Sequence, residues 1–412
     1  MAGNALVHYR YSLFLKAILV KAFNLFCLGR AGTCLGTMAF AGALPVIREE
    51  WHIDAAAAGT IQTVFSISNA CALFAASWLC DYLGARKVYL IFSWFGVLAL
   101  LLFACFARSY SSALVMMAFV GLTQGGAYTP AMMLAMGMNS VPKRGLAVGM
   151  ILAAGSFGYL LSVFISAWGA LRWGASFAFS LCAAGALVGA VSGSVALSGY
   201  QEDMYRTQKQ GGSAKSHVLS VGAILLMVGY IAHCWELLGS WAWTPSLVTN
   251  ALQAWQMEPM ATGLIVACAV HLSGMFSTLI VGAISDYFNR ASVLIFMGAA
   301  GALSSLLMGL SVSWGAGWTL LFAFMGSFFI LGDSGVLSAA IADNVPQAKL
   351  GSVMGLRSLL GFGVGSLAPL TFGVVMDSTQ SWELAYSVLA AGGTIAFFSA
   401  CVLRFNCFNA NK

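Results

Sequence analysis

Charge is the scarcest property of this 412-residue sequence. Charged residues make up only 8% of it, with 13 Asp and Glu against 19 Lys and Arg, while 60% of the residues are hydrophobic. So few charged side chains cannot cover the outside of a water-soluble globule, which excludes a soluble fold. The net charge of +6 comes without a basic cluster interleaved with aromatic residues, so nucleic-acid binding is not indicated either.

The sequence also lacks the motifs of several enzyme and cofactor classes. It has no Gly-x-x-x-x-Gly-Lys-Ser/Thr phosphate-binding loop, so an ATP-driven motor within this chain is not expected. No nucleophile–base arrangement is evident, so we do not expect an enzyme. The ten cysteines are scattered without a Cys-x-x-Cys pair, as is typical of small core hydrophobes, and neither a metal nor another cofactor is expected.

What the sequence does contain is a series of twelve apolar runs. Each is long enough to cross a bilayer as a helix, because about 20 residues span the hydrocarbon core. The runs cover residues 17–46, 57–80, 87–107, 111–138, 145–168, 173–198, 217–247, 262–285, 291–313, 316–341, 351–375 and 382–404. Their length and their lack of alternation favour helices over a β-barrel, so the expected fold class is an all-α integral membrane protein.

A short pattern occurs twice in the chain. Asp81 and Asp286 occupy the same place in the two copies, 205 positions apart (286 − 81). A duplication in a hydrophobic chain predicts two homologous membrane bundles that face one another. We therefore expect a six-helix bundle at 1–199, a polar cytoplasmic connector at 200–216 and a second six-helix bundle at 217–412.

Lys and Arg are distributed unevenly between the two sides of the predicted bundles. If the N-terminus is cytoplasmic, fifteen basic residues, Arg357 among them, fall on the cytoplasmic side and only three on the outside. Arg30 is the one remaining basic residue, and it lies within the first run. The positive-inside rule then predicts a multi-pass protein of the plasma membrane with both termini in the cytoplasm.

The duplicated pattern resembles the loop between the second and third helices of the major facilitator superfamily, whose signature runs Gly-x-Leu-x-Asp-Arg-x-Gly-Arg-Arg/Lys. The matching residues of the first copy are Leu79, Asp81, Gly84, Arg86 and Lys87, and those of the second are Gly282, Asp286 and Arg290. Ser77, Tyr82 and Ala85 depart from the signature. The resemblance covers essentially the whole chain and implies a secondary transporter of a small-molecule solute, expected to act as a monomer.

The same resemblance implies a gating role for four charged residues of the pattern. Asp81 and Arg86 in the first copy, with Asp286 and Arg290 in the second, would close the cytoplasmic side. A carboxylate such as Asp81 can do so through contacts with basic side chains and with the N-terminus of a facing helix. The alternative is an ordinary carboxylate at a helix end that pairs with Arg86.

Departures from the motifs of two subgroups of the superfamily narrow the range of expected substrates. Drug/proton antiporters carry Gly-Pro in their fifth helix, where this sequence has Gly155-Ser156, and Arg-x-x-Gln-Gly in their fourth, where it has Gly121-Leu-Thr-Gln124-Gly125. Nitrate and nitrite porters use arginines in their second and eighth helices, which this sequence lacks. Cyanate-type and organic-anion-type porters remain the nearest resemblance.

Five ionisable residues lie within the predicted spans: Arg30, His233, Glu236, His271 and Asp333. Charge at the middle of a membrane costs roughly 2.5–3.5 kcal/mol on insertion scales, so such groups normally face one another or a water-filled cavity. Pro45 marks the outer end of the first predicted helix, and Arg30 is 15 residues before it (45 − 30). At ~1.5 Å per residue this is about 22 Å below the outer end, around or somewhat past the middle of the membrane.

Arg30 is the candidate anion-binding residue, because arginine stays protonated and its planar fork fits carboxylates. An ion pair with Glu236 or Asp333, or a side chain that reaches toward the cytoplasm, is the alternative. The other candidate substrate contacts are Gln124, Tyr230, Trp235 and Ser240.

The run 217–247 carries the densest candidate proton chemistry. His233 and Glu236 are three residues apart and share a helical face, which Ser240 continues. Glu236 would accept a proton near neutral pH if it is buried, since desolvation favours the neutral form of a carboxyl, and His233 titrates in the same range. Asp333 is a further proton site or the counter-ion of Arg30. His271 is a weaker candidate, because a lone histidine on an apolar helix is usually a packing residue.

These observations lead to one main hypothesis and two rivals. The main hypothesis is a transporter that moves a small organic or inorganic anion by alternating access, coupled to protons. The first rival is a proton-driven exporter of drugs or amphipathic metabolites, supported by the 19 methionines and 28 phenylalanines. The second is a membrane sensor or assembly protein that reuses the fold without transport.

Overall fold

The computed structural model describes residues 21–139, 144–201, 220–345 and 347–410, and the secondary structure in these ranges is helical throughout. In chain order the elements are a helix over residues 21–33, η1 (Cys34–Gly36), α2 (Ala39–Trp51), α3 (Ala55–Leu83), α4 (Ala85–Phe106), α5 (Tyr110–Gly137), α6 (Arg144–Trp173), α7 (Ala175–Ala196), α8 (Val221–Gln253), α9 (Pro259–Ala267), η3 (Cys268–Leu272), α10 (Ser273–Tyr287), α11 (Arg290–Leu310), η4 (Ser311–Trp314), α12 (Ala316–Asn344), α13 (Gln347–Gly365), α14 (Ala368–Thr379) and α15 (Trp382–Ala410).

Eleven helices in the described ranges are long and apolar enough to cross a membrane. The one remaining predicted run, 111–138, corresponds to α5. This helix of 28 residues contains Thr123, Gln124 and Pro130. Large apolar side chains cover the outer surface: Phe74, Val115, Phe296 and Phe398 are each between 60% and 67% exposed. The predicted all-α membrane fold is confirmed, and the molecule is a multi-pass membrane protein.

Glycines and capping side chains set the turns between helices. Gly84 and Gly174 begin turns with φ angles of 83° and 88°, which glycine adopts without a steric penalty. The Asp54 carboxylate accepts a hydrogen bond of 2.7 Å from the N–H of Ala57 and so begins α3. Gly84 belongs to the duplicated sequence pattern, and its positive φ angle explains why a glycine stands at that position.

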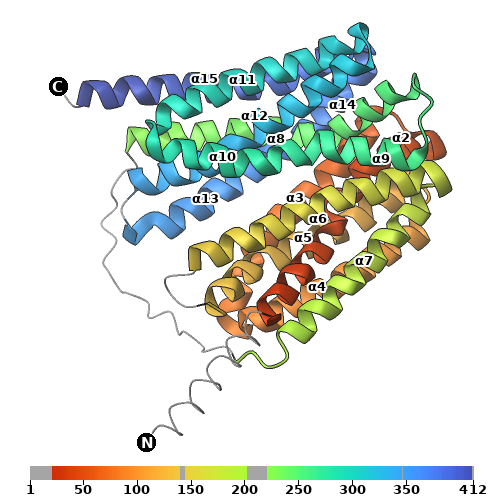
Figure 1. The fold of residues 1–412 in the computed structure, drawn as a ribbon, viewed down its shortest axis with the longest axis horizontal. Coiled ribbons are helices and arrows are strands. Elements are labelled where there is room, and N and C mark those ends of the chain that lie inside the picture. Colours follow the sequence, from red (N-terminus) through yellow and green to blue (C-terminus); the bar gives the residue numbers. More distant parts are fainter. Residues whose placement is uncertain (1–20, 140–143, 202–219, 346, 411–412) are drawn as a thin grey trace, which may run out of the picture.

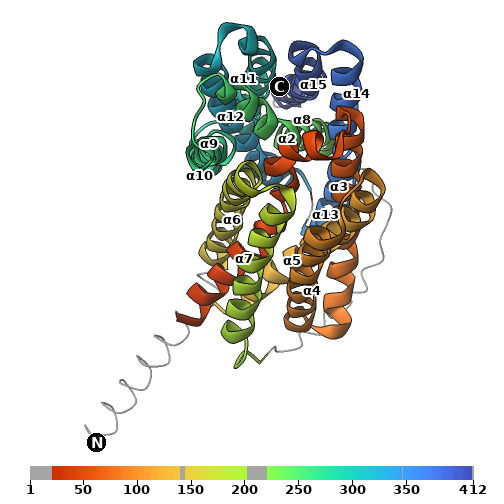
Figure 2. The same cartoon turned by 90° about the vertical axis from the view of Figure 1, so that its right-hand side faces the viewer.

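The helices gather in two groups, which we call the N-terminal half (helix 21–33 to α7) and the C-terminal half (α8 to α15). Figure 1 shows the two halves meeting at the right, near α2, α9 and α14, and diverging toward the left. In Figure 2 the C-terminal half lies above the N-terminal half, with α2 and α3 reaching up to it. Of the predicted connector 200–216, only residues 200 and 201 are described.

One end of the molecule, which we call the closed end, is held by contacts between α3 and α14. The Asp377 carboxylate at the end of α14 accepts hydrogen bonds of 2.8 and 2.6 Å from the N–H groups of Ala55 and Ala56. It therefore caps the first turn of a helix in the other half, where a negative charge is favourable. A Cβ placed on Gly59 would lie 2.3 Å from the carbonyl oxygen of Pro369, so the two backbones touch directly.

Two further contacts join the halves at the closed end. The Arg48 guanidinium lies over the Trp243 ring, 5.9 Å from its centroid. Gly263 of α9 approaches the backbone of Phe164 and Trp168 in α6 so closely that a Cβ would lie 2.9–3.0 Å from it.

The opposite end, which we call the open end, lies on the left of Figure 1, where the two halves diverge. A Cβ at Gly149, Gly282, Gly355 or Gly363 would meet no atom within 4 Å. Among the described residues, the hydrogen bonds between the halves all lie toward the closed end. The structure is therefore one in which the halves are joined at one end and separated at the other.

Candidate functional site

The first membrane helix is interrupted near its middle. The helix over residues 21–33 gives way to the short turn η1, and a regular helix resumes with α2 at Ala39. An interruption of this kind exposes backbone groups, which cannot remain unpaired inside a membrane.

Side chains of α5 and α6 satisfy these backbone groups. The Gln124 side-chain amide donates to the carbonyl oxygen of Thr33 (2.9 Å) and its oxygen accepts from the Thr37 hydroxyl (2.9 Å). The Ser162 hydroxyl donates to the carbonyl of Leu35 and accepts from the N–H of Met38. Gln124, predicted as a substrate contact, therefore holds the interruption in place. Broken helices of this kind surround the binding sites of many transporters.

Arg30 lies one turn before the interruption and is only 3% exposed. Its guanidinium is 5.4 Å from the ring centroid of Tyr128, and Tyr89 and Tyr159 also lie within range of its charge. Its Nε and one terminal nitrogen have no hydrogen-bond partner in the described part of the chain. A buried, unpaired cation surrounded by tyrosines is suited to bind an anion.

The C-terminal half contributes a second buried arginine, Arg357 of α13, which is 8% exposed. Its guanidinium stacks on the Tyr230 ring at 3.8 Å, and one terminal nitrogen donates to the Ser338 hydroxyl at 2.7 Å. Its Nε has no partner among the described residues. Arg357 was predicted among the cytoplasmic basic residues, but it is buried within the apolar span Val353–Thr379. Its place within the run 351–375 was the signal that could have identified it as intramembrane.

Tyr128 of α5 is influenced electrostatically by both arginines. Its phenol lies within range of the charges of both Arg30 and Arg357, and it also interacts with Tyr230 of α8. Arg30 and Tyr128 belong to the N-terminal half, whereas Arg357 and Tyr230 belong to the C-terminal half. The two halves thus face one another here with a guanidinium and a tyrosine each.

His233 lies beside this arrangement, within the C-terminal half. Its Nδ1 is 2.8 Å from an Asp333 carboxylate oxygen, and its Nε2 is 2.6 Å from the Ser334 hydroxyl. Ser338 donates a hydrogen bond to the Ser334 carbonyl, and Ser338 is also the partner of Arg357. His233 and Asp333, the predicted proton-coupling residues, are therefore in contact. Hydrogen bonds through Ser334 and Ser338 link His233 to Arg357.

His271 lies across the interface from Arg30, in the π-helical turn η3. Its ring centroid is 6.2 Å from that of Tyr159 in the N-terminal half and 5.8 Å from that of Trp241. It is 3% exposed, and its Nε2 has no partner in the ranges that the structure covers. A π-helical turn often marks a functional position. The expectation of a satisfied packing histidine does not fit this unpaired nitrogen.

Glu236 does not lie near Arg30. It accepts a hydrogen bond of 2.6 Å from Ser305 of α11, and it fills the space left by Gly301 and Gly393 within the C-terminal half. The described contacts therefore include no ion pair between Arg30 and either Glu236 or Asp333.

Trp235 and Ser240 also face their own half. The Trp235 indole N–H donates to the Val388 carbonyl of α15, and Ser240 shares a hydrogen bond with Thr244. Trp241 contacts Tyr159 across the interface at 5.7 Å between ring centroids. Residues on nearly all sides of α8 are buried, so its sequence alone does not show which side faces the other half.

The predicted gating residues lie at the open end, where contacts within their own half are found for Arg86 and Arg290. Asp81 is exposed, and Arg86 donates to the carbonyls of Ser198 and Tyr200 at 3.2 Å. The Nε of Arg290 is 2.8 Å from an Asp343 carboxylate oxygen. The side chain of Asp286 lies outside the described part of the structure.

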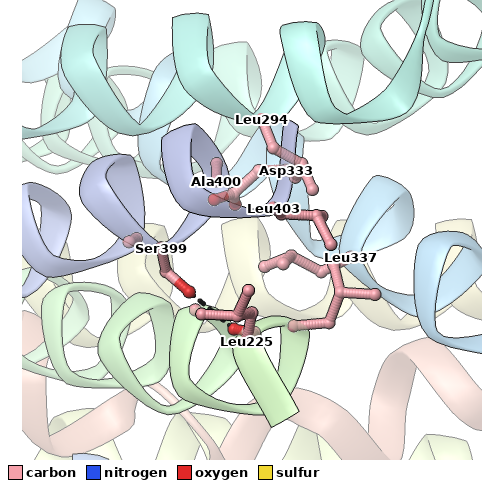
Figure 3. A pocket seen from close by; sticks show the side chains of 10 residues that line it. Leu225, Leu294, Asp333, Leu337, Ser399, Ala400 and Leu403 are labelled. Atoms are coloured by element: carbon pink, nitrogen blue, oxygen red, sulfur yellow. Dashed lines mark hydrogen bonds between the residues drawn. The ribbon is translucent and has the colours of Figure 1, made fainter. Parts of the chain in front are cut away.

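A small cavity of about 10 Å³ lies inside the C-terminal half. Figure 3 shows its lining, in which Asp333 is the one charged residue among mostly leucine and alanine side chains. All the lining residues belong to α8, α11, α12 and α15, so the cavity is separate from the interface of the halves. Its size would admit about one water molecule.

Comparisons with known proteins agree with this geometry. The sequence profile described as the Major Facilitator Superfamily matches residues 26–369. A probable 4-methylmuconolactone transporter of Cupriavidus pinatubonensis is 25% identical over 357 residues, which cover 82% of this chain and 79% of that protein. A probable sulfoacetate transporter of Cupriavidus necator is 22% identical over 382 residues, 85% of each chain.

Solved structures show the same fold. The nucleoside transporter NupG superposes with a TM-score of 0.73 at 14% sequence identity, covering 94% of this chain and 99% of that one. A D-xylose–proton symporter gives a TM-score of 0.75 at 12% identity, covering 93% and 97%.

Proposed function

The chain belongs to the Major Facilitator Superfamily and is a membrane transporter, and from this premise we propose that it moves a small organic anion by proton-coupled alternating access. The observation that carries the proposal is Arg30, a buried guanidinium without a carboxylate partner among the described residues, placed where the two halves face each other. The curated relatives are named as transporters of 4-methylmuconolactone and sulfoacetate, which supports an organic-anion substrate.

The separation of the halves at one end supports alternating access between two bundles, residues 1–199 and 217–412. The excess of Lys and Arg supports a cytoplasmic location of the open end in a plasma membrane. The conformation then faces inward, with Asp377 and the α3–α14 contact as the outer gate. Arg86 and Arg290 of the duplicated loop pattern each have partners within their own half.

A binding screen tests the proposal directly. Thermal stabilisation of the purified monomer would be measured with small carboxylates, sulfonates and inorganic anions, and with cationic drugs beside them. We expect one or more organic anions to raise the melting temperature in a saturable way. Stabilisation by drugs alone would instead support the rival function, an exporter of drugs or amphipathic metabolites.

His233 and Asp333 are the residues we propose for proton coupling. The groups that face this pair are Ser334, the Tyr230 ring and, through Ser338, Arg357, while Glu236 also interacts with Asp333. A proton on the pair adds positive charge beside Arg357 and thereby favours an anion at the interface. Because such coupling is reciprocal, the bound anion in turn favours the proton.

Asp333→Asn is expected to uncouple transport while leaving exchange intact. The variant should no longer accumulate the anion against its gradient when the outside of a proteoliposome is acidified, because the proton acceptor of His233 is lost. Exchange of labelled for unlabelled anion should continue, since that half-cycle needs no net proton movement. Glu236→Gln is the comparison: loss of accumulation in this variant, with Asp333→Asn unaffected, would assign the proton to Glu236 instead.

A further inference from the structure

The substrate site holds more positive charge than one anionic group needs. Arg30 and Arg357 are 97% and 92% buried, given relative exposures of 3% and 8%. Each has an Nε without a hydrogen-bond partner among the described residues, and the described ion pairs assign no carboxylate to either. The buried carboxylate of Asp333 is paired with His233.

The two guanidinium groups also differ in how they are fixed. Arg357 is anchored by Ser338 and by stacking on Tyr230, which leaves the rest of its planar fork available. Arg30 is bordered by tyrosine rings and Cys34, with two of its nitrogens unpaired. A guanidinium fork matches the two oxygens of one carboxylate or similar oxyanion. Each arginine therefore presents a place for a separate anionic group.

We propose that the transported solute is a short dianion, with one acidic group bound by Arg30 in the N-terminal half and the other by Arg357 in the C-terminal half. The proposal rests on the proposed anion-transport function and names its substrate class. We expect a short solute, because the Tyr128 phenol interacts electrostatically with both arginines. A dicarboxylate, or a carboxylate joined to a sulfonate or phosphonate by a few carbons, has this chemistry.

Binding of this kind would also link the solute to the conformational change. A dianion held by one arginine of each half bridges the interface and favours the conformation in which the arginines are closest. A monoanion can bind only one half at a time with the same strength. The preference for two acidic groups would then appear in binding and in transport together, because a ligand shifts an equilibrium only by its differential affinity.

Matched pairs of ligands test the substrate class. Thermal stabilisation of the full-length protein would be measured with dicarboxylates, sulfocarboxylates and phosphonocarboxylates of two to six carbons, each beside its monomethyl ester or its singly charged parent. We expect at least one dianion to bind about 30-fold or more tightly than its monoanionic partner, as the loss of one buried charge contact implies. Equal binding of the two members of every pair, or binding of monoanions alone, would overturn the proposal.

Arg357→Gln assigns the second contact. It should lower the affinity for the best dianion to that of its monoanionic partner and leave monoanion binding within a few-fold. Arg357→Lys, which keeps the charge, and Ser338→Ala, which removes only the anchor, should retain the preference for dianions. If Arg357→Gln does not fold, these two variants and the matched ligand pairs still test whether the protein prefers dianions. If other anions bind the wild type and no dianion does, the inference fails alone. If no anion binds, the anion-transport function fails with it.

Discussion

Replacement of Arg30 by methionine is expected to abolish anion-induced stabilisation and saturable uptake while making the free protein more stable. Loss of one member of a buried charge contact costs about 2–5 kcal/mol of binding, or roughly a 30-fold or greater loss of affinity. Arg30 has no carboxylate partner among the described residues, so its removal relieves the cost of a buried charge. Methionine has a similar length and suits the apolar parts of the surrounding site.

Arg30→Lys is the matched control for this experiment. Lysine keeps the charge but loses the planar fork, so intermediate affinity is expected with little gain in stability. The measurements are melting temperature with and without the anion, and initial rates of uptake into proteoliposomes. A variant Arg30→Met that binds the anion as the wild type does, or that melts at a lower temperature, would show that Arg30 serves the structure and does not bind the substrate.

Much of the fold was predictable because its signals are local. Membrane spans follow from the length of apolar runs, and the turn at Gly84 requires a residue that tolerates a positive φ angle. The duplicated pattern with Asp81 and Asp286 added the family resemblance, which the profile match over residues 26–369 bears out. These features need no knowledge of which helices touch.

The site was less predictable because it depends on which faces of the helices meet. The sequence singled out Arg30, His233 and Asp333 as costly within a membrane, and the structure joins the last two at 2.8 Å. It could not show that Glu236 turns toward Ser305, because α8 is buried on nearly every side and its polar residues do not reveal which helix they meet. Arg357 was missed because its charge was assigned to the cytoplasmic loops.

The closed end was also invisible to the sequence, although it determines the conformation. Asp377 near the chain's last helix caps α3 more than 300 residues earlier. Such a contact has no local signal, since an aspartate at the end of one helix gives no indication that it caps another. Direct backbone contact at Gly59 likewise depends on how the two halves meet. The closed end therefore depends in part on one carboxylate and a few close glycines, which makes it sensitive to a single added methyl group.

Gly59→Ala is expected to open the closed end and shift the transporter away from the conformation of this structure, which we propose faces inward. The new Cβ would lie 2.3 Å from the Pro369 carbonyl oxygen and 2.9 Å from the Cα of Leu370, and backbone atoms cannot rotate away as a side chain does. Overpacking of this kind costs about 1–3 kcal/mol, which corresponds to a roughly 5- to 150-fold shift in a two-state equilibrium. The cost falls only on the conformation in which α3 and α14 touch, so the isolated halves remain unaffected.

Spin labels at Glu49 and Thr379, one on each half of the closed end, would report this shift by electron–electron distance measurements in a background without native cysteines. Both side chains are exposed, so the labels themselves should be tolerated. The distance distribution of Gly59→Ala should move to longer values, and uptake should fall about 10-fold or more as the inward-facing step becomes costly. Gly96→Ala is the control, because its Cβ would meet Thr123 at an ordinary 3.7 Å. An unchanged distance distribution with unchanged uptake would mean that the α3–α14 contact yields easily and does not gate the transporter.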